Sequence, residues 1–476
     1  MNDNPLQCIT MSTRLKIPEE LEPAVDKIAR LVKKAGGKAL IVGGAVRDML
    51  LGKAAKDIDI EIFGIEADHL KEILSQDFKL DLVGLSFGVI KLHHLDIDIS
   101  LPRRESKHGL GHKGFEIMSD PFMTVEEAAT RRDFTINAIY YNPLTQEIID
   151  PYCGCSDLEK LTLRHVSPKF TEDPLRVLRG MQFIARFNLS PAQETIEICK
   201  TVEPEGLPPE RLFAEWKKLL TKGIAISKGL KFLQATGWLQ YYPELEALVG
   251  CEQDPKWHPE GDVWNHTLAC LDAYSQNRTN DDNEELIVGL AVLCHDLGKP
   301  STTKFENGHI RSRGHDEAGV EPTKKFLMRL TNEERILNEV PPLVACHMQP
   351  FALWSAHAGD AAVRRLSLKV KRLDRLVRVM RADDEGRPPF PPRAMNDEIK
   401  WLLETSERLQ IAANAPRPIL QGRDLISLGY KPSRQFGAIL AKAFEAQLDG
   451  IFNTREGAID YFRKQLENTI STDGDQ

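Results

Sequence analysis

Three aspartates are the residues of this chain whose types and spacing point most directly to chemistry. Asp57 and Asp59 alternate with isoleucines, a pattern that predicts a strand with both carboxylates on one face. Asp98 lies at the centre of a similar pattern, Asp-Ile-Asp-Ile-Ser. Clustered carboxylates raise one another's pKa values unless a cation lies between them. Because oxygen ligands of this kind suit Mg²⁺, the three aspartates predict a magnesium site.

A glycine turn precedes these aspartates. Residues 39–48 predict a strand, a tight turn at Gly43-Gly44 and a short helix, an arrangement that brings the backbone close to phosphates. Taken singly, an Asp-x-Asp pair is usually a solvated strand edge, and a Gly-Gly pair is usually a plain turn. Their combination between residues 39 and 61 favours two-metal phosphoryl or nucleotidyl transfer.

The elements that position these residues follow an α+β pattern. A helix is predicted at 24–34, after a loose extension over 1–20. Strands of a mixed sheet are predicted near 39–42, 57–62, 80–83, 88–93 and 97–101. Residues 103–120, rich in glycine and basic side chains, are predicted to be a mobile loop beside the carboxylates. From about residue 157 onward the pattern is helical, and 174–186 is an amphipathic helix behind an acidic start.

The composition is that of a soluble globular protein with several domains. Of its 476 residues, 42% are hydrophobic and 28% are charged, as in soluble globular proteins. Because a domain with one hydrophobic core rarely exceeds about 250–300 residues, a chain of this length should form several domains. No apolar run approaches the roughly 20 residues that span a bilayer, and no signal peptide is visible. Eight cysteines in this length are not a disulfide framework, and Cys153-Gly-Cys155, without a second pair, is predicted to be a turn. We expect a cytoplasmic protein.

Charge is distributed unevenly along the chain. The net charge of −8 argues against wholesale polyanion binding but not against a local basic surface. Basic residues concentrate in one stretch, at Arg103, Arg104, Lys107, Lys113, Arg131, Arg132, Arg164, Lys169, Arg176, Arg179 and Arg186. A solvated helix face explains some of them, but it does not explain arginines embedded in apolar runs. A salt bridge to a neighbouring helix is the structural alternative for the Arg131–Arg132 pair.

Four motifs, in this order, resemble one family. Gly-Gly-Ala-Val-Arg-Asp at 43–48, Asp-Ile-Asp at 57–59, Arg-Arg-Asp-Phe-Thr-Ile-Asn-Ala at 131–138 and Glu-Asp-Pro-Leu-Arg-Val-Leu-Arg at 172–179 resemble the class II tRNA nucleotidyltransferases. These are the CCA-adding enzymes of the polymerase-β-like superfamily, and bacterial poly(A) polymerases are close relatives. The resemblance covers roughly residues 39–220.

The resemblance implies roles for particular residues. Asp57 and Asp59 would hold two Mg²⁺ ions, and Asp98 is the candidate for the third catalytic carboxylate. Residues that would contact the nucleotide are Gly44, Arg47, Arg103, Arg132, Asp133, Asp173, Arg176 and Arg179. Gly44 and Arg47 would bind the triphosphate, and Arg132 and Asp133 the ribose. The implied partners are CTP, ATP and the 3′ end and acceptor/T arm of tRNA, with neither DNA nor a membrane.

Asp173 and Arg176 are expected to select the base. An aspartate accepts a hydrogen bond from the exocyclic amino group of C or A, and an arginine three residues on lies on the same helix face. UTP and GTP present a carbonyl at that place, which would leave Asp173 unpaired. An ordinary helix cap is the structural alternative for Glu172 and Asp173. The loop 103–120 corresponds to the family's flexible loop, linked to the switch from C to A addition, and its presence favours terminal A addition.

A second set of residues resembles the HD metal-dependent phosphohydrolases. The order is His, His-Asp, His, His, Asp, at His266, His295, Asp296, His315, His347 and Asp383. Such side chains on several helices can converge on one divalent ion or a pair, whose identity the residues leave open. His309 and Asp384 are possible substitutes for His315 and Asp383. Some bacterial CCA-adding enzymes carry an HD domain with phosphatase and 2′,3′-cyclic phosphodiesterase activity, which implies repair of damaged 3′ ends.

The resemblances imply five parts. A polymerase-β-like nucleotidyltransferase head with a mixed sheet is followed by an all-α neck/body and an all-α HD domain. The expected bounds are 1–20 for the extension, 21–145 for the head, 146–255 for the neck/body, 262–390 for the HD domain and 395–476 for a helical C-terminal region.

Three alternatives stay open. The chain could add only A or only CC, because the base-selecting pair suits both nucleotides equally. It could be a poly(A) polymerase, although those relatives usually end in a basic tail and this chain ends in Ser-Thr-Asp-Gly-Asp-Gln. The alternative of another class is an RNA-binding HD hydrolase with an inactive nucleotidyltransferase part. The presence of every catalytic carboxylate argues against this alternative.

Overall fold

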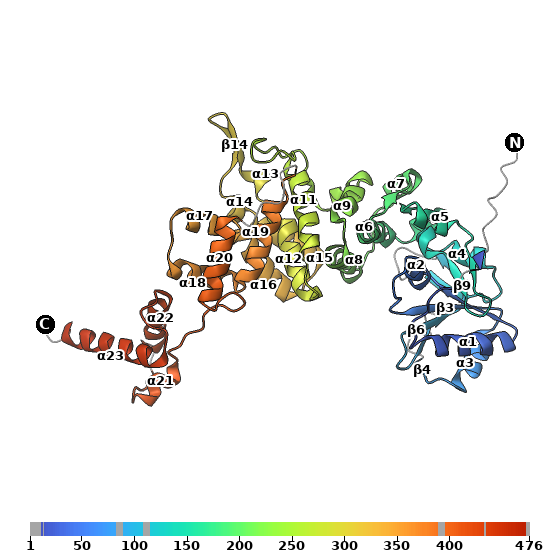
Figure 1. Ribbon diagram of the computed structural model, residues 1–476, viewed down its shortest axis with the longest axis horizontal. Coiled ribbons are helices and arrows are strands. Elements are labelled where there is room, and N and C mark those ends of the chain that lie inside the picture. The colour runs from blue at the N-terminus through green and yellow to red at the C-terminus, as the bar shows by residue number, and fades with distance from the viewer. Residues whose placement is uncertain are drawn as a thin grey trace. The chain divides into compact units, whose positions relative to one another are not determined.

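The chain divides into two compact units, Met1–Tyr241 and Tyr242–Gln476 (Figure 1). A computed structural model describes residues 11–12, 14–81, 89–107, 115–388, 396–432 and 435–472. Over these ranges no helix is long and apolar enough to cross a membrane. The finer domain bounds expected from the sequence stay predictions. Lys113 in the basic stretch and most of the proline-rich segment after Arg387 lie outside the described residues.

The first unit begins with a mixed α/β part and continues with helices. Its strands are β1 (Met11–Ser12), β2 (Lys38–Val42), β3 (Ile58–Phe63), β4 (Leu80–Asp81), β5 (Val89–Leu92), β6 (Ile97–Ser100), β7 (Arg103–Lys107), β8 (Phe115–Ser119), β9 (Tyr140–Asn142), β10 (Glu147–Ile149), β11 (Thr162–Leu163) and β12 (Ser190–Pro191). Its helices are α1 (Glu22–Lys34), α2 (Gly44–Leu50), α3 (Ala67–Ser75), α4 (Val125–Ala129), η3 (Thr135–Asn137), α5 (Gly154–Glu159), η4 (Pro168–Glu172), α6 (Leu175–Phe187), α7 (Gln193–Lys200), α8 (Pro209–Lys222), α9 (Ile226–Ala235) and η5 (Trp238–Tyr241).

One mixed sheet dominates the first unit. Among the residues described, it has eight strands in the order β1-β10-β9-β2-β3-β6-β5-β4. Only the β3–β6 pair in this sheet is parallel, so the two acidic strands run side by side in the same direction. The α+β class expected from the sequence is confirmed.

The two faces of the sheet carry different side chains because side chains alternate along a strand. The isoleucines of β3 and β6 join α1 and α3 in one apolar core (Figure 1). Asp59, Glu61 and Phe63 of β3 therefore point to the other face, with Asp98 of β6. The alternation of isoleucine with acid places the carboxylates together.

Two expectations about segments were wrong. The extension 1–20 is not loose throughout, because β1 pairs with β10, and Leu15 and Ile17 are buried in the core. The segment 103–120 is not simply a loop, because β7 and β8 pair as an antiparallel ribbon. Its tip, 108–114, lies outside the described residues. The sheet also contains β9 and β10, which the sequence analysis did not identify.

Helices α8 and α9, together with the short strand β11, contact α6. The approach of α9 is close. A Cβ added at Gly229 would lie 2.5 Å from the Met181 carbonyl oxygen, so only glycine allows this packing. The amphipathic helix predicted at 174–186 is confirmed with bounds of 175–187.

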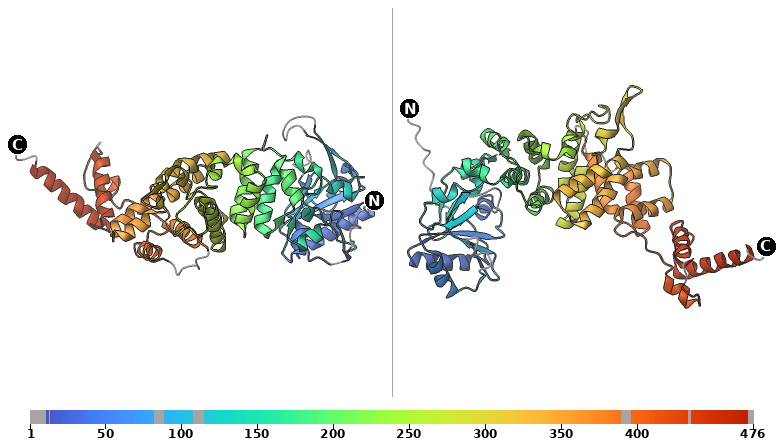
Figure 2. Two further views of the ribbon diagram at one scale, coloured as in Figure 1. Left: turned by 90° about the horizontal axis from the view of Figure 1, so that it is seen from above. Right: turned by 180° about the vertical axis from the view of Figure 1, so that it is seen from behind.

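The second unit is helical, with one projecting hairpin that is visible in Figure 2. Its helices are α10 (Pro243–Glu246), α11 (Val263–Gln276), α12 (Asp282–Cys294), α13 (Lys299–Thr302), α14 (His315–Ala318), α15 (Val320–Leu330), α16 (Glu334–Cys346), α17 (Gln349–Ser355), α18 (Asp360–Val370), α19 (Leu373–Glu385), α20 (Asp397–Arg408), α21 (Gly422–Ser427), α22 (Gln435–Leu448) and α23 (Arg455–Thr472). The hairpin consists of β13 (Thr303–Glu306) and β14 (His309–Ser312).

Helix α12 is at the centre of this unit. It is buried almost from end to end and packs against α11, α16 and α19. Buried ion pairs fix its start, since Glu285 accepts hydrogen bonds from Arg378 of α19 at 2.6 and 2.7 Å. The end of α12 carries His295 and Asp296 into the interior.

Candidate functional site

The first candidate site lies on the acidic face of the sheet. Asp59 of β3 is directly opposite Asp98 of β6 in the parallel register, and opposite Val42 of β2 on its other side. Asp57 precedes β3 by one residue and is exposed, like Asp59, whereas Ile58 and Ile60 are buried. This exposure pattern places Asp57 and Asp59 on the solvent side of the strand.

The glycine turn lies against this face. Gly43 follows Val42 with a φ of +79°, in the left-handed region that favours glycine. A Cβ at this position would lie 3.3 Å from Nη1 of Arg132 and 3.7 Å from Oδ2 of Asp59. The turn, the carboxylate and the arginine are therefore packed together.

The three carboxylates form an oxygen-only donor set that fits a hard cation. Neighbouring protein atoms partly desolvate the Asp59 carboxylate and raise its pKa, Arg132 opposes this effect, and Asp57 and Asp98 add to it. Asp98 is paired with Lys91, whose Nζ donates to Oδ2 of Asp98 at 3.0 Å. Across the described parts of the chain, the three aspartates do not form a group with all ligand atoms within 4.8 Å.

Glu61 is a residue of this site that the sequence analysis missed. Its carboxylate is fully buried on β3 and lies 2.6 Å from Nη2 of Arg131 and 3.4 Å from Nη2 of Arg132. The Tyr140 hydroxyl donates to it at 3.0 Å. Burial alone would raise the pKa of Glu61, but the two guanidinium groups bring it below its usual value. The arginine pair thus has a salt-bridge partner, on a strand and not on a helix.

A second polar network joins three of the predicted nucleotide contacts. Asp133 accepts from Nε of Arg179 at 2.7 Å and from Nδ2 of Asn137 at 3.0 Å. Asn137 in turn accepts from Nη1 of Arg47 at 2.6 Å. Asn137 lies within the third motif, which is the signal that could have identified it. Arg47 and Arg179 are held by these partners, and Asp133 is buried between them.

The pair that was predicted to select the base, Asp173 and Arg176, is built differently from the prediction. Helix α6 begins at Leu175, so Asp173 precedes it, and its Oδ1 accepts from the Leu175 N–H at 3.1 Å. Its Oδ2 accepts from Nη2 of Arg211 on α8 at 2.9 Å. Arg176 donates to the backbone carbonyls of Lys169 and Arg131. The shared helix face was therefore wrong, although the helix-cap contact exists.

The remaining predicted contact, Arg103, begins the ribbon and pairs in backbone register with Ser119. The first unit thus links Arg47, Asp133 and Arg179 in one network, with Gly44 next to Arg47, and places Arg132 beside Asp59 at the Gly43 turn. Arg211, 38 residues from Asp173 in sequence, is a further residue that no local pattern indicated.

The second candidate site is a cluster of histidines and aspartates in the second unit. His315 Nε2 lies 3.2 Å from His347 Nε2 and 3.4 Å from Asp296 Oδ1. His295 Nε2 lies 3.2 Å from Asp296 Oδ2, and His266 Nε2 lies 3.0 Å from Asp383 Oδ1. These six residues are the ones named from the sequence. Three of them lie on helices α11, α14 and α19, and the other three lie in the turns directly after α12 and α16.

Backbone carbonyls orient three of the four histidines. The Nδ1 atoms of His295, His315 and His347 each lie 2.7 Å from the carbonyl oxygen three residues earlier, of Val292, Ser312 and Val344 respectively. An Nδ1–H that donates to a carbonyl leaves Nε2 as the lone-pair acceptor, which is how proteins orient histidine ligands of a metal. Two such acceptors 3.2 Å apart repel each other unless a cation lies between them.

Charged neighbours complete the cluster. Burial alone would raise the pKa of Asp296, but His295 and Lys299, whose Nζ lies 2.7 Å from Oδ2, hold it well below its usual range. Burial and the adjacent histidines lower the pKa of His347 to about 4, so this ring is neutral at pH 7. Glu260, missed from the sequence, bonds to Nδ1 of His266 at 2.7 Å.

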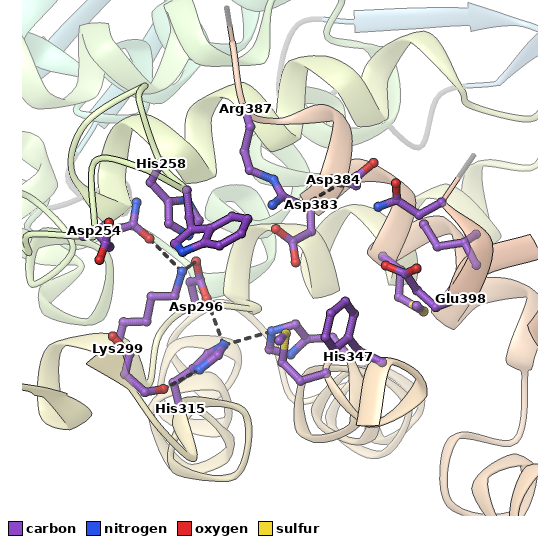
Figure 3. Close-up of a pocket in the computed structure, with 18 of the residues that line it drawn as sticks. Asp254, His258, Asp296, Lys299, His315, His347, Asp383, Asp384, Arg387 and Glu398 are labelled. Carbon is purple, nitrogen blue, oxygen red and sulfur yellow. Dashed lines mark hydrogen bonds and ion pairs between the residues drawn. The ribbon is translucent and has the colours of Figure 1, made fainter. Parts of the chain in front are cut away.

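The structure separates the alternatives that spacing left open. His309 is exposed on β14 and bonds to Asp254 at 2.9 Å, away from the cluster. Asp384 pairs with Arg387 at 2.7 Å, whereas Asp383 points toward Asp296 and His347 (Figure 3). A cavity of about 590 Å³ opens onto the cluster, lined in part by Asp296, His315, His347 and Asp383. The donor set of imidazole and carboxylate fits one or two divalent transition ions.

The chain is similar in sequence to known proteins. The family model for the poly A polymerase head domain matches residues 39–164. The multifunctional CCA protein of Xylella fastidiosa (strain 9a5c) is 36% identical over 369 residues, covering 74% of this chain and 84% of the relative. That of Stenotrophomonas maltophilia (strain R551-3) is 35% identical over 425 residues, covering 85% and 98%.

The fold is also similar to solved structures. The CCA-adding enzyme of Bacillus stearothermophilus in complex with CTP matches with a TM-score of 0.64 and 22% identity, over 95% of this chain and all of the other. The Thermotoga maritima enzyme complexed with tRNA matches with a TM-score of 0.59 and 20% identity, over 94% and 96%. At such identities the likeness concerns the fold.

Proposed function

This chain belongs to the family of bacterial multifunctional CCA proteins, and we propose that it adds CCA to tRNA 3′ ends from CTP and ATP without a nucleic-acid template. The observation that carries the proposal is the placement of Asp59 opposite Asp98, beside the Gly43 turn and Arg132. The similarity to the relatives extends over most of the chain, as far as 85% of it. The absence of a membrane-spanning helix over the described ranges is consistent with a cytoplasmic enzyme.

The carboxylates would position the reacting groups. Two divalent ions, Mg²⁺ in this proposal, would supply activation of the tRNA 3′-hydroxyl and charge neutralisation on the departing pyrophosphate. Asp57 and Asp59 would hold these ions, and Asp98 would join them on release from Lys91. Gly44 and Arg47 would contact the triphosphate, and Arg132, fixed by Glu61, would contact the ribose.

Nucleotide selection would depend on a charged platform at the start of α6. Asp173 faces Arg211, and Arg176 is tied to two backbone carbonyls, so both side chains are held before a nucleotide arrives. A fixed carboxylate that accepts from the amino group of C or A would reject U and G, which present a carbonyl oxygen at that position. Arg103 would contact the nucleotide from the ribbon, and Arg179 from α6.

An extension ladder tests this function. Transcripts that end in the discriminator base, in C or in CC are offered CTP, ATP or both. The products distinguish complete CCA addition from CC-only, A-only and poly(A) synthesis, and a ladder of more than one A would overturn the proposal. Asp59→Ala should abolish extension, whereas Asp68→Ala, at an exposed position of α3, should leave it unchanged.

We propose a second function for the histidine–aspartate cluster, metal-dependent hydrolysis of phosphomonoesters and 2′,3′-cyclic phosphates. The specific observation is that imidazole nitrogens and two carboxylates converge beside a cavity. A divalent ion would supply an activated water there. The reaction would clean damaged 3′ ends before nucleotides are added.

His295→Ala tests the second function. Hydrolysis of a 2′,3′-cyclic phosphate should be lost, while CTP and ATP incorporation should continue at the wild-type rate. Hydrolysis that persists in this variant would contradict the assignment of the cluster.

A further inference from the structure

Cys270 is a buried thiol beside the histidine–aspartate cluster that the proposed hydrolysis does not use. It lies one turn after His266 on α11 and has no exposed surface. Its Sγ is 3.4 Å from Nε2 of His266, the nitrogen that faces Asp383. The ligand atoms of Cys270, His266, His295 and Asp383 all lie within 4.8 Å of one another.

The packing of two helices holds the thiol in this position. Helix α19 ends at Gly386, where an added Cβ would lie 2.8 Å from the Cα of Cys270. Only glycine permits so close an approach of α19 to α11. The same approach brings Asp383, one turn earlier on α19, to its position opposite His266.

A buried nitrogen without a hydrogen bond points to a ligand in the same space. Nε2 of His295 lies 3.2 Å from Asp296 Oδ2 but forms no hydrogen bond, and the His295 side chain is 1% exposed. Its Nδ1 is already committed to the carbonyl of Val292, so Nε2 presents a lone pair. A buried lone pair without a donor costs free energy that a bound cation would offset.

We propose that Cys270 is a thiolate ligand of the ion held by His266, His295 and Asp383, so that this site takes a borderline-soft ion such as Zn²⁺ in preference to Mg²⁺. The inference rests on the proposed metal site of the second unit and specifies its donor set. On binding, the S–H bond breaks, the proton goes to solvent and sulfur donates its electron pair to the ion. No oxidant or reductant takes part.

As a consequence, the two units would prefer different metal ions. The donors of the first unit are carboxylate oxygens, which suit Mg²⁺. Two imidazoles, a carboxylate and a thiolate are a donor set typical of zinc-class ions. Each unit would keep its own ion when both ions are present.

Cobalt(II) spectroscopy on the full chain tests the inference. A Co²⁺–thiolate bond gives a near-ultraviolet charge-transfer band that Co²⁺–imidazole and Co²⁺–carboxylate bonds lack. We expect this band in the wild-type protein loaded with Co²⁺ and its loss in Cys270→Ser. Competition between Zn²⁺ and Mn²⁺, read by metal content, should show Zn²⁺ affinity lower by about 10–100-fold in Cys270→Ser.

Cys294→Ser is the matched control. Cys294 is also buried, and it immediately precedes His295, but its thiol is outside the ligand group. The charge-transfer band and the Zn²⁺ preference should stay unchanged in this variant. Circular dichroism of both variants confirms that the helices remain folded.

The outcomes distinguish a failure of the proposed Cys270 ligand from a failure of the proposed metal site itself. A cluster that binds Co²⁺ with visible ligand-field bands but no thiolate band, or with a band that survives Cys270→Ser, overturns the role of Cys270 alone. In that case the thiol is a packing residue. If His295→Ala leaves all Co²⁺ bands and the bound metal unchanged, the metal site and the inference are both overturned.

Discussion

Arg211 is the residue whose role is least visible from the sequence. It faces Asp173 at 2.9 Å, from a different helix, and it fixes the carboxylate that is proposed to distinguish C and A from U and G. Without the guanidinium, Asp173 would lose this ion pair and keep the hydrogen bond from the Leu175 N–H, so the carboxylate would be held less firmly. Selectivity should therefore depend on a side chain that need not touch the base.

Arg211→Ala should relax base selection. We expect UTP incorporation relative to CTP to rise about tenfold or more, because a hydrogen bond to a charged group is worth about 1.5–3 kcal/mol. The measurement is the ratio of kcat/KM for the two nucleotides on one tRNA. Arg211→Lys should restore most of the selectivity, and Lys217→Ala on the same helix should not change it. An unchanged ratio with weaker tRNA binding would show that Arg211 serves the RNA.

Some candidate residues could be identified from a local sequence pattern, and others only from their contacts in the folded chain. Asp57, Asp59 and Asp98 could be predicted because alternation along a strand fixes the face on which each side chain lies. Glu61 belongs to the same alternation, but only its buried contacts with Arg131 and Arg132 reveal that it holds these arginines. Cys270 and Glu260 depend on which helices meet, and no spacing in the sequence encodes that meeting.

At the scale of elements, the β7–β8 ribbon can be shortened without altering the eight-stranded sheet, so its proposed part in the switch from C to A addition can be tested alone. Its two strands pair over five residues each, beyond the strand that carries Asp98. Its glycine and basic residues led to the prediction of a loop. The sequence gives only a weak signal for two short strands that pair across an intervening segment of several residues.

Replacing residues 106–116 with Asn-Gly should leave a short hairpin and shift the products. We expect C incorporation to continue and terminal A incorporation to fall about 100-fold, since misplacement of a contacting group by about 1 Å can cost that much. Transcripts ending in CC, offered ATP alone, give the rate directly. Equal losses for CTP and ATP would contradict a role in the switch between nucleotides.

The link between α12 and α19 predicts a pH dependence of stability. Burial would raise the pKa of Glu285, but Arg378 and Thr279 lower it below the value of 4.5 usual for an unfolded chain. A folded-state pKa that is depressed stabilises the fold above the unfolded pKa, and this contribution is lost as the pH falls through the folded value. The second unit should therefore lose stability below about pH 4.5.

Glu285→Gln measures this contribution. At pH 7 the variant should unfold with a free energy lower by about 1–3 kcal/mol, since an uncompensated Arg378 remains. The difference from wild type should shrink as the pH is lowered below 4.5, as followed by urea unfolding. Glu317→Gln, at an exposed position of α14, is the comparison. A difference that stays constant with pH would contradict the linkage.

For the whole molecule, the two sites should act independently. The carboxylate site lies in the unit Met1–Tyr241, and the histidine–aspartate cluster lies in the unit Tyr242–Gln476. The sequence resemblance predicted two chemistries and their order along the chain. The division at residue 241 could not be read from composition, because helices precede and follow it without a break in polarity.

A pair of variants tests this independence. Asp59→Ala should lose nucleotide addition and retain hydrolysis of 2′,3′-cyclic phosphate, and Asp383→Ala should do the reverse. Each retained activity should stay within about twofold of wild type, since sites in separate units without shared partners behave additively. A loss of both activities in either single variant would show that the two chemistries are coupled.

The strands at the two ends of the eight-stranded sheet have a consequence for the handling of the protein. Both β1 and β4 are two residues long, so the sheet offers little unpaired backbone on which another chain could add a strand. β1 also covers the edge of β10. Removal of Met11 and Ser12 would expose that edge, and self-association during refolding at high concentration would then compete with recovery of the native fold.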